Sequence, residues 1–315
     1  MRLLTGAALG AALFTSASAQ ERLPLTFPLD CTLGEDCFIT ALMDHDVGSF
    51  SVDYSCGTLT RDTHSGTDFT LPDFAEMARG VNVLAAAPGT VVGIRDRLPD
   101  TGTDYGDEEC GNGVAVSHGS GWVTQYCHMK RGSVTVEPGE TVTAGQVLGQ
   151  VGRSGAATLP HLHLSLRKDD DEVDPFAPAT IGCGNGQPAL WETPIAAPAA
   201  GFLKAGFATE VPSYDAVRDA FESATDLSST APIVAWVSGY GSRPGDVLTT
   251  TISSENGVFS EQEDILERRQ EAWFRFSGRR FTDTPWSKGR YTATITLSRQ
   301  GQVIAKTAFS ATLEN

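Results

Sequence analysis

Short runs of alternating apolar and polar residues, separated by glycine-containing turns, fill residues 23–183. The clearest runs are VNVLAAAPGTVVGIR, GNGVAVSHGSGWVTQYCHM, SVTVEPGETVTAGQVLGQVG and LPHLHLSLR. Because side chains of a strand point to the same face at every second residue, this alternation predicts half-buried strands. Pro88-Gly89 and Pro138-Gly139 suit tight reversals between strands. The pattern therefore predicts an antiparallel, strand-rich domain over residues 20–183.

The rest of the chain has a different pattern. Residues 184–201 are rich in Gly, Pro and Ala without periodicity, which predicts a linker. In the stretch 202–315, Ser213 can cap a short helix with Val217 and Phe221 on one face. Five later runs have the spacing of strands in a small immunoglobulin-like β-sandwich: PIVAWVSGY, DVLTTTIS, EAWFRFSGRRF, GRYTATITLSR and GQVIAKTAFSATL. We therefore expect an all-β protein with two domains.

The first twenty residues, MRLLTGAALGAALFTSASAQ, place one positive charge before an apolar run. The run ends in Ala17-Ser18-Ala19, which predicts a signal peptide over residues 1–19 and cleavage before Gln20. An N-terminal membrane anchor is the alternative, although the run is short for a bilayer span. No later stretch predicts a transmembrane segment. We expect an exported protein, in the periplasm or outside the cell.

The cysteine count agrees with an oxidising compartment. Six cysteines follow the predicted cut: Cys31, Cys37, Cys56, Cys110, Cys127 and Cys183. An even number in an exported chain predicts three disulfides, and the absence of a CxxC spacing argues against a cysteine metal site. Cys110 and Cys127 flank the strands of one predicted hairpin, so we expect them to pair. The other pairings stay open.

Composition and charge exclude one class of partner. The 315 residues are 40% hydrophobic and 20% charged, which is ordinary for a soluble globular protein. The formal net charge is −16, and no basic stripe follows the chain, so we expect no nucleic acid partner. The acidic runs at 107–109 and 169–172 are read as solvated surface. A saline habitat would also account for the charge.

Three residues have the character of a metal site. In the run His161-Leu162-His163, both imidazoles would share one face of a strand while Leu162 points into the core. His64 and Asp68 stand four residues apart across a glycine-containing bend. Either motif alone is weak, because a surface turn or a structural histidine would explain it. Combined with His163, His64 and Asp68 supply three zinc ligands and leave a fourth position for water, as in catalytic sites.

Three motifs occur in order along the chain: His64-x-x-x-Asp68, Tyr126-Cys127-His128-Met129 and Pro160-His161-Leu162-His163. Their order and surroundings resemble the LytM-type (lysostaphin-like) zinc endopeptidases, over roughly residues 56–175. The resemblance implies a lysostaphin-type peptidase core of antiparallel sheets. It implies Zn²⁺ held by His64, Asp68 and His163, with His128 and His161 as catalytic histidines. The substrates it implies are the peptide stems of peptidoglycan.

The catalytic roles of the two histidines stay open. One would take a proton from water, and the other would stabilise the oxyanion or protonate the leaving amine. His161 is favoured as the base because its strand places it beside a ligand. The loop at residues 154–160 departs from the family pattern without changing a ligand. Cys127, directly before His128, is a second departure, which we read as a disulfide partner rather than a reactive thiol.

Local context predicts the roles of two further histidines and of one segment. His118 follows a strand at a turn and is read as structural or as support for the site. His45 lies between two acids and is read as an exposed loop histidine. The segment 98–106 is expected to form a rim of the substrate groove.

Two other functions remain in view. Some relatives of this family have lost zinc ligands and activate other wall hydrolases, but all five motif positions are intact here, which favours catalysis. The same fold could instead cleave a glycine-rich secreted protein. The C-terminal domain has no His or Cys, so a chain ending near Gly184 is expected to cleave small peptides. The alternative is that this domain packs firmly on the first and is needed for its folding.

Overall fold

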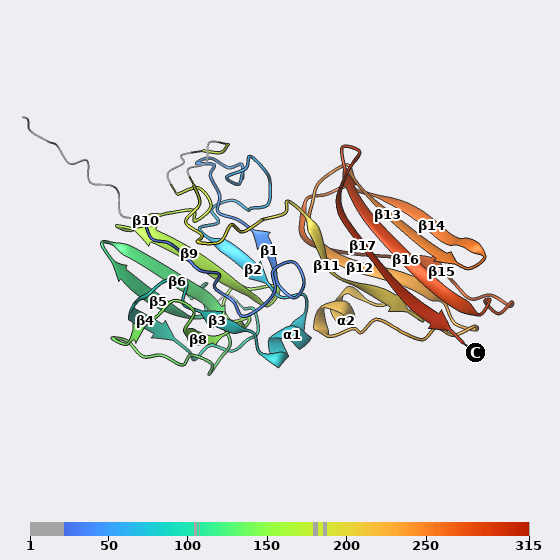
Figure 1. Cartoon of the computed structure of the whole chain (residues 1–315), viewed down its shortest axis with the longest axis horizontal. Helices are drawn as coiled ribbons and strands as arrows, with labels where there is room; N and C mark the ends of the chain where they lie inside the picture. The colour runs from blue at the N-terminus through green and yellow to red at the C-terminus, as the bar shows by residue number, and fades with distance from the viewer. Residues whose placement is uncertain (1–21, 104–105, 107, 179–181, 185–187, 315) are drawn as a thin grey trace, which may run out of the picture.

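The computed structural model describes residues 22–314 except 104–105, 107, 179–181 and 185–187. The predicted signal peptide and its cleavage site lie outside the described residues. Figure 1 shows two strand-rich parts side by side along the long axis of the molecule. We call them the N-terminal part, which precedes Gly201, and the C-terminal part, which begins there. No helix in the described ranges is long and apolar enough to span a bilayer.

One sheet dominates the N-terminal part. Its strands lie in the order β1 (Phe38–Ala41), β2 (Thr67–Thr70), β9 (His161–Lys168), β6 (Trp122–Met129), β5 (Asn112–Gly119), β4 (Gly89–Arg95) and β7 (Thr141–Val142), with β10 (Asp171–Glu172) paired to β9. Strands β3 (Asn82–Leu84) and β8 (Val147–Gln150) form a separate pair, and α1 (Phe74–Arg79) follows β2. The described strand pairs are antiparallel, which confirms the predicted fold class.

The predicted alternation builds the core of this part. Val114 and Val116 of β5, Tyr126 of β6 and Leu162 and Leu164 of β9 are almost completely buried. Each buried aliphatic side chain of this size contributes about 1.5–3 kcal/mol relative to exposure. His163, between the two leucines of β9, faces the opposite side of the sheet, so the register of β9 is fixed by its leucines.

Two sheets form the C-terminal part. One has the order β11 (Gly201–Ala208), β12 (Ile233–Ser242) and β15 (Gln270–Arg279); the other has β14 (Gly257–Leu266), β13 (Asp246–Ser254), β16 (Gly289–Arg299) and β17 (Gln302–Leu313). Apolar side chains from both sheets share common clusters. Helix α2 (Tyr214–Asp219) is capped as expected, since Ser213 accepts a hydrogen bond from the backbone of Ala216 at 3.1 Å. Strands β11 and β14 were not predicted, and most of β14 is polar and exposed.

The two parts are packed against each other. Leu203 and Tyr240 belong to the same apolar cluster as the core of the N-terminal part, and the ring of Tyr240 lies 6.2 Å from that of Phe38. Leu190 and Trp191, in the predicted linker, are also buried in that cluster. The segment therefore serves as part of a core, whereas the boundaries 20–183, 184–201 and 202–315 stay predictions.

All six cysteines form disulfides. The predicted pair Cys110–Cys127 is confirmed, and Cys31–Cys37 and Cys56–Cys183 are the others. Cys56–Cys183 joins positions 127 residues apart and so ties the segment before β2 to the segment after β10.

Candidate metal centre

Strands β2 and β9 bring two of the predicted ligands face to face. Asp68 is directly opposite His163 in the antiparallel register. The alternation of β9 places His161 and His163 on the same side and leaves Leu162 fully buried. His64 enters from the turn before β2, so all three candidate ligands converge although 99 residues of sequence separate His64 from His163.

The three candidate ligand atoms already have the spacing that a small ion requires. His64 Nε2 lies 3.0 Å from Asp68 Oδ1, and His163 Nδ1 lies 2.8 Å from the same oxygen. The two nitrogens are 3.1 Å apart. Ligands at zinc bond lengths in a tetrahedron would be roughly 3.3 Å apart. Two imidazole nitrogens and a carboxylate oxygen also form a donor set that zinc accepts, so the residues fit the ion.

A glycine allows this turn to lie against β9. A Cβ atom at Gly66 would come within 2.4 Å of the Leu164 carbonyl oxygen and 2.8 Å of His163 Nε2. Any other residue would push the turn that carries His64 and Asp68 away from β9. The glycine between the two predicted ligands is therefore required for all three to meet.

Asp68 is a buried carboxylate that remains charged. Burial alone would raise its pKa, but the neighbouring imidazoles of His64 and His161 and the hydrogen bond from His163 hold the pKa well below its usual range. Its second oxygen accepts a hydrogen bond from Arg61 Nη1 at 2.8 Å. Sequence reasoning missed Arg61, because nothing in its local context distinguishes it from a surface arginine.

Two further histidines lie beside the three. The ring centroids of His128 and His161 are 4.4 Å apart. His128 Nδ1 lies 2.8 Å from the Ser154 carbonyl oxygen, and His161 Nδ1 lies 2.9 Å from the Leu159 carbonyl oxygen. Each ring is thus held with Nδ1 as the donor, which leaves Nε2 unprotonated. Burial lowers the pKa of both rings, so they are neutral at neutral pH. His161 Nε2 is buried without a hydrogen-bond partner among the described residues.

Comparison with known proteins agrees with this geometry. Residues 62–175 match the model of peptidase family M23. We call residues 62–175, which match this model, the M23 domain. Peptidoglycan DD-endopeptidase ShyA of Vibrio cholerae is 33% identical over 103 residues, which cover 33% of this chain and 20% of that protein. Cell division protein DipM of Caulobacter vibrioides is 32% identical over 106 residues, which cover 33% of this chain and 16% of that protein.

The chain thus spans a fifth or less of the length of these two curated relatives. Among solved structures, a putative M23 peptidase from Pseudomonas aeruginosa is 29% identical and covers 49% of this chain and 52% of that one, with a TM-score of 0.29.

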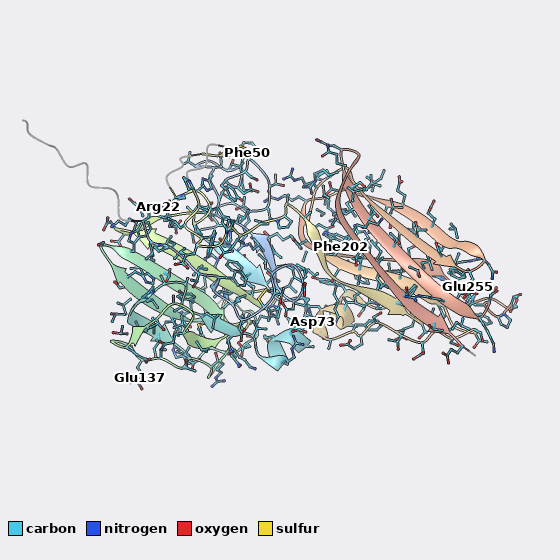
Figure 2. The ribbon with its side chains drawn as sticks, in the orientation of Figure 1. Arg22, Phe50, Asp73, Glu137, Phe202 and Glu255 are labelled. Carbon is cyan, nitrogen blue, oxygen red and sulfur yellow. A yellow bond between two sulfur atoms is a disulfide. The ribbon has the colours of Figure 1, made fainter. Side chains whose placement is uncertain are left out.

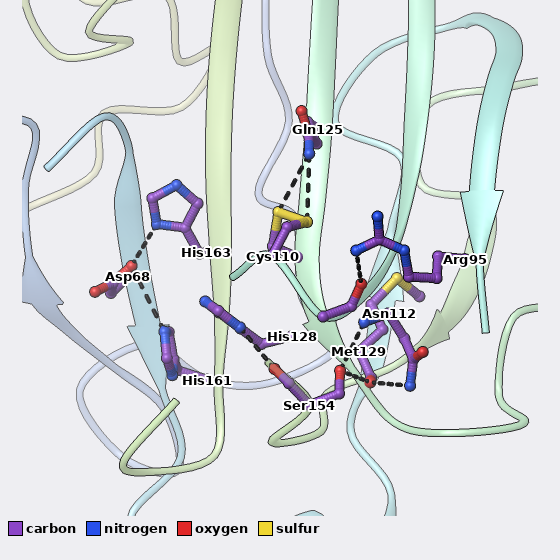
Figure 3. The surroundings of a disulfide bond; sticks show 12 residues. Asp68, Arg95, Cys110, Asn112, Gln125, His128, Met129, Ser154, His161 and His163 are labelled. Carbon is purple, nitrogen blue, oxygen red and sulfur yellow. Dashed lines mark hydrogen bonds and ion pairs between the residues drawn. A yellow bond between two sulfur atoms is a disulfide. The ribbon is translucent and has the colours of Figure 1, made fainter. Parts of the chain in front are cut away.

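The M23 domain holds His128 through a disulfide and a network of backbone groups. Its backbone adopts a left-handed conformation with φ of 62°, and its N–H donates to the Cys110 carbonyl at 2.8 Å. Figure 3 shows Gln125 with its amide directed at both sulfurs of Cys110–Cys127. Ser154 also holds this region. Its hydroxyl accepts a hydrogen bond from the Asn112 backbone N–H, and its carbonyl accepts one from His128 Nδ1. The position of His128 therefore depends on the segment that ends at Cys110.

A cavity of about 450 Å³ lies over the M23 site and is lined by His64, His128 and His163. The described residues of the segment 98–106 are absent from its lining, so the expectation that this segment forms the rim is wrong for them. Leu98 is instead buried, with its N–H donating to the Asn112 side chain at 2.8 Å. The buried contact fixes the start of the segment away from the cavity.

The remaining histidines lie outside the M23 centre. His118 bridges the Pro88 carbonyl at 2.7 Å and the Thr124 hydroxyl at 2.8 Å, in keeping with a structural role. The expectation that His45 is exposed is wrong: its side chain is 5% exposed, and Nε2 donates to Asp174 at 2.7 Å. Asp174 is 129 residues further along the chain, so the local sequence gave no sign of this partner.

Proposed function

We propose that this protein is an exported, zinc-dependent endopeptidase that hydrolyses peptide cross-links of bacterial peptidoglycan. The observation that carries the proposal is the convergence of His64, Asp68 and His163 within ligand distance, beside two neutral histidines. The name of ShyA, a peptidoglycan DD-endopeptidase, supports the substrate. The name of Mpg of Neisseria meningitidis, a DD-carboxypeptidase/endopeptidase, supports the hydrolysis of peptide bonds. A wall hydrolase also has to act outside the cytoplasm, in agreement with the disulfides.

The proposed residues divide the work as follows. Zinc held by His64, Asp68 and His163 would supply a Lewis acid that polarises a carbonyl and acidifies a water molecule. His128 and His161 each offer an unprotonated Nε2 that can accept a proton from the attacking water. The ring that has accepted this proton can then donate it in a hydrogen bond to the oxyanion or return it to the leaving amine. Arg61 keeps the Asp68 carboxylate oriented through the oxygen that does not face the histidines.

Digestion of purified peptidoglycan tests this function. The metal-loaded protein is expected to convert cross-linked muropeptides to uncross-linked ones, with the new amine and carboxyl ends identified by mass spectrometry. The Asp68→Ala variant and chelator-treated protein should leave the cross-links intact. Unchanged cleavage by the metal-free protein would contradict the zinc assignment. Release of glycan fragments alone would contradict the peptidase assignment.

A further inference from the structure

A second cavity adjoins the candidate metal centre where the two parts of the protein meet. Its volume is about 170 Å³. The N-terminal part contributes Asp68, His161 and Arg61, and the C-terminal part contributes Leu203, Glu271 and Ala272. Arg61 and Ala156 line both this cavity and the larger one that holds His128. A peptide bound across the metal centre can therefore extend into both.

The wall from the C-terminal part is held in place by packing. Ala272 of β15 is directly opposite Tyr240 of β12 in the sheet register, and Tyr240 packs on Phe38 of β1. Lys204 of β11 forms an ion pair with Asp73, a residue 2% exposed that also caps α1. Strand β15 is thus tied to the N-terminal part through β12 and β11 of its sheet.

Opposite charges from the two parts face this cavity. Arg61 donates a hydrogen bond from Nη1 to Asp68. Because its side chain is 40% exposed, the other N–H groups of the guanidinium can bind a second acceptor. Burial opposes the charge of Arg61, but the carboxylates of Asp68 and Glu271 outweigh burial and raise its pKa. Glu271 is an exposed acid at the other wall. The cavity therefore has a guanidinium on one side, paired with Asp68 through one of its nitrogens, and the exposed Glu271 carboxylate on the other.

We propose that this interdomain cavity is a substrate subsite for a free amino acid head group, with its ammonium against Glu271 and its carboxylate against Arg61. A diamino dicarboxylic acid residue, whose side chain ends in such a group, fits both charges. The subsite rests on the proposed peptidase function and adds a specificity residue, Glu271, from outside the M23 domain. Because Asp68 and His161 line the same cavity, the bound residue lies close to the scissile bond.

Three synthetic peptides that differ at one residue test the subsite with the full-length, metal-loaded protein. That residue is 2,6-diaminopimelate, lysine with the ammonium alone, or 2-aminopimelate with the carboxylate alone. We expect kcat/KM to be at least about tenfold higher for the diaminopimelate peptide than for either other, the scale of one charged hydrogen bond. Equal cleavage of the three peptides would overturn the proposal.

The variant Glu271→Gln should remove the preference for the diaminopimelate peptide over the 2-aminopimelate peptide, because these two differ in the ammonium group. It should keep the preference for the diaminopimelate peptide over the lysine peptide, because these two differ in the carboxylate. Metal content and the unfolding temperature should not change. Glu263→Gln, at an exposed position on β14 outside the cavity, is the matched control and should keep both preferences. An equal loss for all three peptides with Glu271→Gln would show a structural role and refute the subsite.

Failure of the proposed function gives a different result from failure of the subsite. If the proposed peptidase function is wrong, the wild-type protein cleaves no peptide and no purified wall. Calorimetry with free 2,6-diaminopimelate then tests the subsite, which predicts at least about tenfold weaker binding by Glu271→Gln than by Glu263→Gln. Equal or absent binding in both variants would overturn it.

Discussion

Asp68 and His163 lie directly opposite each other on β2 and β9, with His163 Nδ1 2.8 Å from Asp68 Oδ1. Two predicted ligands are therefore held by a strand pairing rather than by loops. Because both strands are also fixed by buried neighbours such as Leu162 and Phe69, the distance between these atoms is set by the core. A site built in this way is expected to persist when a single ligand is removed.

The Asp68→Ala variant should lose both metal and activity while the fold persists. Removing the carboxylate takes away one of three ligands, and the disulfides and the core of β9 do not depend on it. Metal content measured by mass spectrometry and thermal unfolding of the metal-free proteins separate the two effects. Asp215→Ala, at an exposed position on α2, is the control and should retain metal. Full metal occupancy in Asp68→Ala would contradict the ligand assignment.

His128→Ala and His161→Ala should separate metal binding from catalysis. Neither ring is assigned as a ligand, so each variant should retain zinc and lose at least ~10²-fold in kcat, the scale of a positioned acid–base group. Metal analysis and turnover of a soluble cross-linked peptide measure the two properties. A zinc-free His161→Ala protein beside a zinc-loaded His163→Ala protein would mean that the roles within the HxH motif are reversed.

Removal of the Cys110–Cys127 disulfide should reduce turnover more than metal binding. The Cys110 carbonyl receives the His128 N–H, and a displacement of about 1 Å at a catalytic group can cost ~10²-fold. We expect the double variant Cys110→Ser, Cys127→Ser to keep its metal and lose at least about tenfold in kcat. The matched control removes Cys31–Cys37, which lies outside the cavities at the site, and should retain turnover.

The buried pair of His45 and Asp174 predicts a pH-dependent stability. The hydrogen bond and charge of Asp174 raise the pKa of His45 against the effect of burial. The stabilisation is complete below about pH 6.5, the pKa of an unfolded histidine, and is lost as the pH rises through the higher pKa of the folded protein. The wild type should therefore exceed His45→Gln in unfolding temperature most at low pH, and the difference should shrink as the pH rises through this window. Parallel profiles of the two proteins from pH 5 to 9 would contradict the prediction.

Truncation at Gly184 should destabilise the M23 domain. It removes Leu190, Trp191, Leu203 and Tyr240 from the shared core, and loss of one large buried side chain typically costs about 3–5 kcal/mol. This favours the alternative of firm packing over the expectation of an independent peptidase. Thermal unfolding of chains that end at Gly184 and at Glu192 measures the share of Leu190 and Trp191. Equal unfolding temperatures for the Gly184 chain and the full protein would contradict this.

Local patterns in the sequence were sufficient for much of the M23 domain. The alternation in β9 predicted both the buried Leu162 and the shared face of His161 and His163. The Cys110–Cys127 pair was predictable because it belongs to one hairpin. These features depend on neighbours that are close in sequence or on a strand period of two.

Features that depend on distant partners were not predictable in this way. His45 pairs with Asp174, and Glu271 joins a cavity with Arg61, across long separations that no local pattern encodes. Trp191 lies among prolines and alanines, so its burial depends on the surface that the folded core offers. Polar residues of β14 were likewise unrecognised as a strand, because an edge exposed to solvent needs no apolar alternation.

The disulfide beside His128 also links the geometry of this histidine to the compartment in which the protein folds. Disulfides persist in oxidising compartments and are reduced in the cytosol by thiol systems. A chain that stays in the cytosol therefore lacks the bond between Cys110 and Cys127 that fixes the carbonyl under His128. The geometry around His128 is therefore expected to form fully only in an oxidising compartment, in agreement with the proposed export.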